Sequence, residues 1–215
     1  MPEYDCIIPW SGGVESTAVV NWAVNNNKTP LCIHVRMNPA EWSSVQKMAS
    51  IFNVNVFKVE QDISQIPVDP NNRNFYSKRF GYHNKWSPVI HNWVYWSSFA
   101  NITNPTIKNI FYGHCGAGLV EQGDGLGDQM HDGAVAIFNS FENYFNAYFV
   151  DSKFIAPLDH LTKREQWLTL PNEIKKEIFT CNVYESIINE TNCRKCPKCT
   201  SLTRAVPENE WHFIK

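Results

Sequence analysis

The chain has 215 residues, of which 43% are hydrophobic and 19% charged, so it can bury a core and is not a disordered protein. Its net charge of −2 excludes a strong general attraction to nucleic acid or to membrane surfaces. No apolar run reaches the roughly 18 residues that a membrane-spanning helix needs, and the first residues lack the pattern of a signal peptide.

The N-terminal part of the chain predicts the order strand, helix, strand, helix, strand. We expect strands at Cys6–Trp10, Leu31–Met37 and Asn55–Val59, and helices at Ser16–Val24 and Glu41–Phe52. This alternation predicts a parallel sheet with right-handed crossovers and helices on both faces.

The rest of the chain predicts two more strands of the same sheet. In chain order we expect a long polar loop over 61–90, a helix at Val89–Ile102, a strand at Lys108–His114, a glycine-rich acidic loop over 116–133, a helix at Ala134–Tyr148, a strand at Phe154–Leu158 and a helix at Thr162–Leu170. Thr162 and Glu165 have the spacing of a capping box. The fold expected is therefore α/β, with a five-stranded, parallel, doubly wound sheet in a domain of residues 1–170. A helical C-terminal segment, 171–215, would pack on it.

The sequence SGGVES, residues 11–16, lies between the first predicted strand and the first predicted helix. Gly12 and Gly13 let the backbone wrap closely around an anion, and Ser11 and Ser16 add hydroxyl donors at its rim. The first-turn N–H groups of the following helix lack intrahelical acceptors and point toward the same place. The pattern is neither a P-loop nor GxGxxG. A plain helix cap by Ser11 followed by a glycine turn is the alternative.

A cluster of cysteines near the C-terminus predicts a metal site. Cys193, Cys196 and Cys199 form two overlapping CxxC steps, and Cys181 lies upstream as a fourth thiol. Four thiolates suit a structural zinc ion, and the neighbouring basic residues offset their charge. An iron–sulfur cluster and a redox CxxC are the alternatives. The odd total of seven cysteines does not suit a disulfide framework, so we expect a reducing, cytoplasmic location.

Two motifs together carry a family resemblance. SGGVES resembles the SGGxDS loop of the PP-loop ATP pyrophosphatases, which have an adenine nucleotide alpha hydrolase-like fold, with Glu15 in place of the usual Asp. The C-terminal cysteines make the chain similar to the QueC (ExsB) family, the 7-cyano-7-deazaguanine synthases. Weaker resemblances lie at APLDHLTKREQW (156–167), YGHCGAG (112–118) and HNWVYWSS (91–98), where His91 stands in place of an Arg. The family's substrate loop has no clear match, and Asp132 is its only plausible counterpart.

The resemblance implies an ATP-dependent ligase of queuosine biosynthesis. Such an enzyme adenylates the carboxylate of 7-carboxy-7-deazaguanine, or of a similar deazapurine, and converts it with ammonia to an amide and a nitrile, releasing AMP and pyrophosphate. It implies ATP, Mg²⁺ and Zn²⁺ as cofactors, and a homodimer. By the same resemblance, the ATP-binding residues are Ser11, Gly12, Gly13, Val14, Glu15, Ser16, Thr17 and Val35; the catalytic residues are Ser16, Lys163 and Cys115; the substrate-binding residues are His91, Asn92, Asp128 and Asp132; and the zinc ligands are Cys181, Cys193, Cys196 and Cys199.

Other functions stay open at the level of the sequence. A relative encoded with nucleic-acid modification or antiviral defence could adenylate a different acid or a protein terminus. Sulfur transfer would need a reactive cysteine pair away from the metal site, where only Cys115 is at hand. An inactive, nucleotide-binding zinc module is the non-enzymatic alternative. ATP turnover separates this last alternative from the enzymes, and the mass of the product separates the enzymes from one another.

Overall fold

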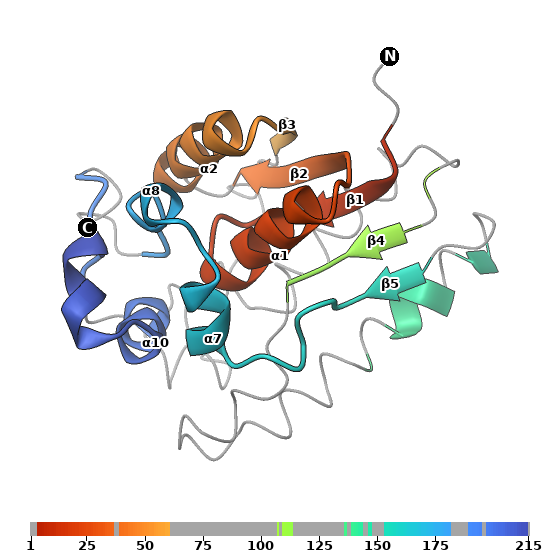
Figure 1. Ribbon diagram of the computed structural model, residues 1–215. Coiled ribbons are helices and arrows are strands. Elements are labelled where there is room, and N and C mark those ends of the chain that lie inside the picture. The colour runs from red at the N-terminus through yellow and green to blue at the C-terminus, as the bar shows by residue number, and fades with distance from the viewer. Residues whose placement is uncertain are drawn as a thin grey trace, which may run out of the picture.

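The computed structural model has an α/β architecture built on one sheet (Figure 1). It describes residues 4–36, 39–60, 107, 109–113, 136, 139–143, 146–147, 153–181, 189–194 and 197–214. The predicted loop over 61–90, the predicted helix Val89–Ile102 and the glycine-rich loop 116–133 lie outside these residues.

Five strands form a single, entirely parallel sheet in the order β3-β2-β1-β4-β5, which confirms the five-stranded parallel sheet expected from the sequence. The strands are β1 (Cys6–Pro9), β2 (Pro30–Arg36), β3 (Asn55–Glu60), β4 (Asn109–Phe111) and β5 (Lys153–Ile155). The central strand β1 is buried along its whole length, as expected for a parallel strand covered on both faces.

The two faces of the sheet are covered by different parts of the chain. Cys6 and Ile8 of β1 belong to a core shared with helices α1 (Val14–Asn25) and α2 (Pro39–Phe52). Ile7 belongs to a second core, against which Phe141 of the helical residues 139–143 packs. The alternation of side chains along β1 therefore sends successive residues into two separate cores.

Four short C-terminal elements lie beyond the carboxyl ends of the strands. They are α7 (Lys163–Leu168), α8 (Asn172–Lys175), α10 (Pro197–Ala205) and the 3₁₀-helix η1 (Glu208–Phe213). In Figure 1 the arrowheads of β2, β4 and β5 point toward the side where these elements gather. Trp167, Leu202 and Phe213 are buried in the same core as α1, so this part of the chain completes the core.

The element bounds differ from those expected at two places that bear on the site. Helix α1 begins at Val14, two residues before the expected Ser16, so the glycines directly precede it. Strand β5 ends at Ile155 and not at Leu158, since Pro157 has no N–H to donate to a neighbouring strand and a turn follows. The capping box of Thr162 and Glu165 is confirmed, and its hydrogen bonds lower the pKa of Glu165. In the described residues, no helix is both long and apolar enough to span a membrane.

Candidate functional site

The loop Ser11–Gly13 connects the carboxyl end of β1 to α1, and its backbone requires glycine at one position. Gly12 has a φ of +84°, in the left-handed region that other residues rarely adopt. A Cβ atom there would also lie only 3.0 Å from Cγ2 of Val45 on α2. Gly12 thus permits both the turn and the close packing of the loop on α2.

Helix α1 begins without a side-chain cap. Its N-cap residue is Gly13, which has no side chain that could cap the first turn. The alternative of a helix cap by Ser11 is therefore wrong: the Ser11 hydroxyl accepts instead from the N–H of Gly13, at 3.4 Å. At such an N-terminus the first-turn N–H groups have no acceptor within the 12-residue helix, and the positive end of the helix dipole lies there.

The space beside Gly13 is small and polar. A Cβ atom built on Gly13 would have Ser11 Oγ at 3.5 Å and Glu15 Oε2 at 3.8 Å as its two nearest described neighbours. Ser16 Oγ accepts from the Ser11 N–H at 3.2 Å and lies 3.0 Å from Ser11 Oγ. This cradle is about the size of a methyl group and is bordered by hydroxyls and helix N–H groups. It can therefore accept a phosphate oxygen.

Three of the residues expected to bind ATP have fully buried side chains, and a fourth, Ser16, is only 8% exposed. Val14, Thr17 and Val35 are at most 1% exposed. The Thr17 hydroxyl accepts a hydrogen bond from Trp10 Nε1 at 3.0 Å and so serves the core. Only the backbone groups of these three residues can face a ligand.

A further residue of the site, Gly113, directly follows the tyrosine after β4. A Cβ atom on Gly113 would lie 2.5 Å from the carbonyl carbon of Glu15 and 2.6 Å from Cα of Ser16, and closer still to the Ser16 nitrogen. The sheet thus touches the first turn of α1 through a glycine. The sequence marked Gly113 only as a strand end, and the signal that could have found it is its place at the carboxyl end of a parallel strand.

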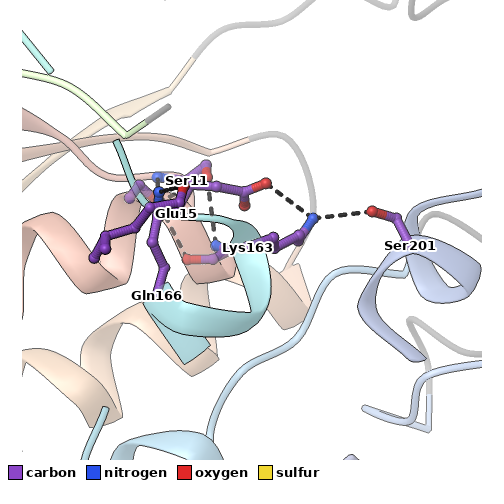
Figure 2. A network of polar contacts seen from close by, with 8 residues as sticks. Ser11, Glu15, Lys163, Gln166 and Ser201 are labelled. Atoms are coloured by element: carbon purple, nitrogen blue, oxygen red, sulfur yellow. Dashed lines mark hydrogen bonds and ion pairs between the residues drawn. The ribbon is translucent and has the colours of Figure 1, made fainter. Parts of the chain in front are cut away.

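Lys163 joins the loop from a distant part of the sequence. It is the first residue of α7, and its Nζ lies 2.9 Å from Oε1 of Glu15. The same Nζ donates a hydrogen bond to Oγ of Ser201 on α10, at 3.2 Å. Figure 2 shows the Glu15 carboxylate and the Ser201 hydroxyl on opposite sides of the Lys163 ammonium. The lysine and the loop that the resemblance assigned to one ATP molecule are thus in contact.

The start of α7 is also anchored by the buried side chain of Gln166. Gln166, also seen in Figure 2, donates from Nε2 to the carbonyl of Leu158 at 2.9 Å and to that of Leu161 at 3.3 Å. The turn that leads into α7 is therefore fixed by Gln166 as well as by the capping box. Both hold the backbone of Lys163 at the loop.

His34, directly before Val35 in β2, is buried. Its Nδ1–H donates to the carbonyl of Trp10 at 2.8 Å, and its ring stacks on Trp42, with centroids 5.5 Å apart. Burial lowers the pKa of His34. The imidazole therefore ties the end of β2 to the residue before the loop. Burial likewise raises the pKa of Cys6 and of Cys32, and both belong to the core.

Three of the four predicted metal ligands form a cluster. The sulfur atoms of Cys181, Cys193 and Cys199 all lie within 4.8 Å of one another, although they come from three separate segments. Thiolates around a tetrahedral zinc ion are about 3.8 Å apart, which follows from a Zn–S distance of about 2.3 Å. The cluster is compatible with a metal such as zinc.

A buried asparagine braces the cysteine cluster. Asn192 Oδ1 accepts from the Thr180 N–H at 3.1 Å and from Cys199 Sγ at 3.7 Å, and Asn192 Nδ2 donates to the Ile178 carbonyl at 3.4 Å. Asn192 therefore links all three cysteine-bearing segments. Arg194, directly after Cys193, has a φ of 59°, in the left-handed region.

The remaining predicted site residues lie outside the described part of the chain. They are Cys115, His91, Asn92, Asp128, Asp132 and Cys196. In comparisons with known proteins, no family model matches the sequence and no curated protein matches it.

Proposed function

We propose that the protein is an ATP-dependent ligase of the PP-loop type, similar to the QueC family. It would adenylate the carboxylate of a 7-carboxy-7-deazaguanine-like molecule and convert the product with ammonia to an amide and a nitrile. The observation that carries the proposal is the contact of Lys163 with Glu15 beside an uncapped helix N-terminus. A lysine, a close-fitting glycine loop and the positive end of a helix dipole meeting at one point are suited to a polyphosphate.

In this proposal the loop holds the pyrophosphate that leaves from ATP. The backbone N–H groups of the first turn of α1 and the hydroxyls of Ser11 and Ser16 donate to its oxygens. The Lys163 ammonium balances the negative charge that develops there. Bound Mg²⁺ would supply further charge neutralisation, and Glu15 could offer it a carboxylate. The loop lies at the carboxyl end of the central strand, which is where parallel α/β sheets bind ligands.

The cysteine cluster has a structural role in this proposal. Cys181 and Cys199 are at most 1% exposed, which leaves little room for a substrate at the metal. With Cys196 as the fourth ligand, a closed zinc site would stabilise the fold and take no part in the chemistry. An iron–sulfur cluster has the same ligand type, and its visible absorption would distinguish it from zinc.

The test is to incubate the purified protein with ATP, Mg²⁺, ammonium and 7-carboxy-7-deazaguanine and to identify the products by mass spectrometry. We expect AMP together with an amide or nitrile product. Ser16→Ala should lose this activity and keep its metal, because it removes the loop hydroxyl that accepts from Ser11 and leaves the cysteines in place.

Two results would contradict the proposal in different ways. Bound but intact ATP, with every acid offered, would point to the inactive nucleotide-binding module. Failure to bind ATP at all would show that the protein has no nucleotide site. AMP formed with another acid would keep the ligase chemistry and change the substrate.

A further inference from the structure

The two predicted motifs of the chain meet at one lysine. Lys163 contacts Glu15 of the glycine loop and Ser201 of α10, and Ser201 is two residues after Cys199 of the cysteine cluster. The loop and the cysteine segment lie at opposite ends of the sequence. In the fold the Lys163 side chain bridges Glu15 and Ser201 (Figure 2).

The Ser201 contact fixes a group that is otherwise flexible. A lysine side chain has four rotatable bonds, so one partner does not define where its ammonium lies. Glu15 and Ser201 hold Nζ from two directions, at 2.9 and 3.2 Å, and Lys163 is only 13% exposed. An ammonium has three N–H donors. Two have acceptors in the described residues, and the third is then available for a ligand oxygen.

The position of Ser201 depends in turn on the cysteine cluster. Cys199 and Leu202, on either side of Ser201 in α10, are each 1% exposed and belong to two different buried clusters. Helix α10 has only nine residues, too few for an isolated helix to be stable. Its first turn is therefore held by packing and by the environment of the Cys199 thiol, which a bound metal ion would fix.

We propose that Ser201 is a positioning residue: it ties the Lys163 ammonium to the cysteine-bearing helix, so that metal in the cluster sets how tightly the glycine loop binds a polyphosphate. This inference rests on the proposed function, because it assumes that the loop binds the phosphates of ATP. It assigns the cysteine cluster a role in ligand affinity as well as in folding.

The first experiment measures the binding of ATP and of inorganic pyrophosphate by calorimetry. Ser201→Ala should weaken both by about tenfold, the lower range for a hydrogen bond to a charged group, with metal content and melting temperature unchanged. Ser201→Thr keeps the hydroxyl and should restore the affinity. Thr203→Ala is the matched control, because Thr203 lies on the same helix and its hydroxyl donates only to the Cys199 carbonyl, at 2.9 Å.

The second experiment needs no nucleotide. The rate at which an amine-acylating reagent modifies Lys163 is followed by mass spectrometry in the wild type, the three variants and chelator-treated protein. The rate should rise in Ser201→Ala and after metal removal, return to the wild-type value when Zn²⁺ is added back, and stay unchanged in Thr203→Ala.

The outcomes separate this inference from the proposed function. A wild type that binds neither ATP nor pyrophosphate overturns both, because the inference assumes that the loop binds a polyphosphate. If the wild type does bind these ligands, then equal affinity and equal Lys163 modification in wild type and Ser201→Ala overturn the inference alone. Lost affinity that Ser201→Thr does not restore would also overturn it, since the hydroxyl would not be the cause.

Discussion

At the scale of single residues, the close contact of Gly113 with the first turn of α1 controls the shape of the candidate site. Any side chain at Gly113 would meet backbone atoms of Glu15 and Ser16, which cannot move without moving α1. Gly13, four positions before Thr17 in α1, is different, because the nearest atoms to a Cβ there are 3.5 Å away or more. Gly113 therefore serves close packing, whereas Gly13 leaves the room that our proposal assigns to a ligand.

This contrast gives a prediction with its own control. Gly113→Ala should lower the free energy of unfolding by about 1–3 kcal/mol, as overpacking does, and should also weaken ATP binding. Gly13→Ala should stay within about 1 kcal/mol of the wild type, since it changes only the helix cap, yet lose pyrophosphate affinity because its methyl group fills the cradle. Urea unfolding and calorimetry measure the two effects. Equal stability of the two variants would contradict the steric account of Gly113.

The residues of the site differ in how well the sequence predicts them. Ser11–Ser16 and the C-terminal cysteines are local patterns, readable because their chemistry depends on neighbours in the chain. The roles of Gly113 and Ser201 depend on contacts with residues about 100 and 38 positions away, respectively. No spacing rule encodes such distances, so these residues emerge only from the fold.

At the scale of elements, a buried ion pair holds three short helices together. Glu210 of η1 accepts from Lys175 Nζ at 2.9 Å and from Trp167 Nε1 at 2.6 Å, which joins η1 to α8 and α7. Lys175 is only 4% exposed, and its Nζ lies 5.6 Å from the centre of the Trp167 ring. Helices α8 and η1 have four and six residues, so this contact and the core around it hold them in place.

Glu210 should make stability depend on pH in a defined direction. Burial by itself would raise the pKa of Glu210, but hydrogen bonds from Lys175 and Trp167 outweigh it, and the pKa is lowered. The folded protein thus binds this proton less readily than the unfolded chain. The stabilisation is complete above the unfolded carboxyl pKa of about 4.3 and is lost as pH falls through the lower folded value.

The corresponding variant is Glu210→Gln. It should cost about 2–3 kcal/mol at pH 7, because it leaves the Lys175 charge without its partner, and the difference from wild type should shrink below about pH 4. Glu208→Gln, at an exposed position of the same 3₁₀-helix, is the control and should change little. Chemical denaturation at several pH values gives the comparison. A Glu210→Gln deficit that persists at acid pH would contradict the ion-pair explanation.

The same elements show what sequence patterns could and could not predict. The five strands were expected at their places because each is a short apolar or alternating run next to a turn. No bounds were predicted for α8 and η1, since so few residues show no period. Glu210 of η1 is held by Trp167 of α7 and Lys175 of α8. Tertiary contacts, not local preference, decide those segments.

At the scale of the whole molecule, one core connects the sheet to the C-terminal elements. Ile174, Leu202 and Phe213 are buried in the same cluster as Cys6 and Ala18. A chain ending at residue 170 would lose these partners and expose part of the surface of α1. The C-terminal part therefore contributes to the stability of the sheet itself.

We predict that the full chain unfolds in one calorimetric transition, and that residues 1–170 alone do not fold. Removing metal with a chelator should lower the melting temperature of this single transition. The reason is that Cys181 and Cys199 share a buried cluster with Phe179 and with Ala40 of α2. Calorimetry of the full chain, with and without chelator, tests the single transition and its shift, and circular dichroism of the shortened chain tests whether residues 1–170 fold. Two separate transitions would show that the C-terminal segment is an independent unit.

The order of the strands also has a consequence for synthesis on the ribosome. Strands β1, β2 and β3 pair within the first 60 residues, whereas β4 reaches β1 only across about 100 residues, at the pairing of Cys6 with Asn109. Closing such a long loop comes late. The contact between Lys163 and Ser201 forms later still, because both residues lie further along the chain. An emerging chain can thus form its glycine turn early, but the lysine and its serine partner join it only when translation is nearly finished.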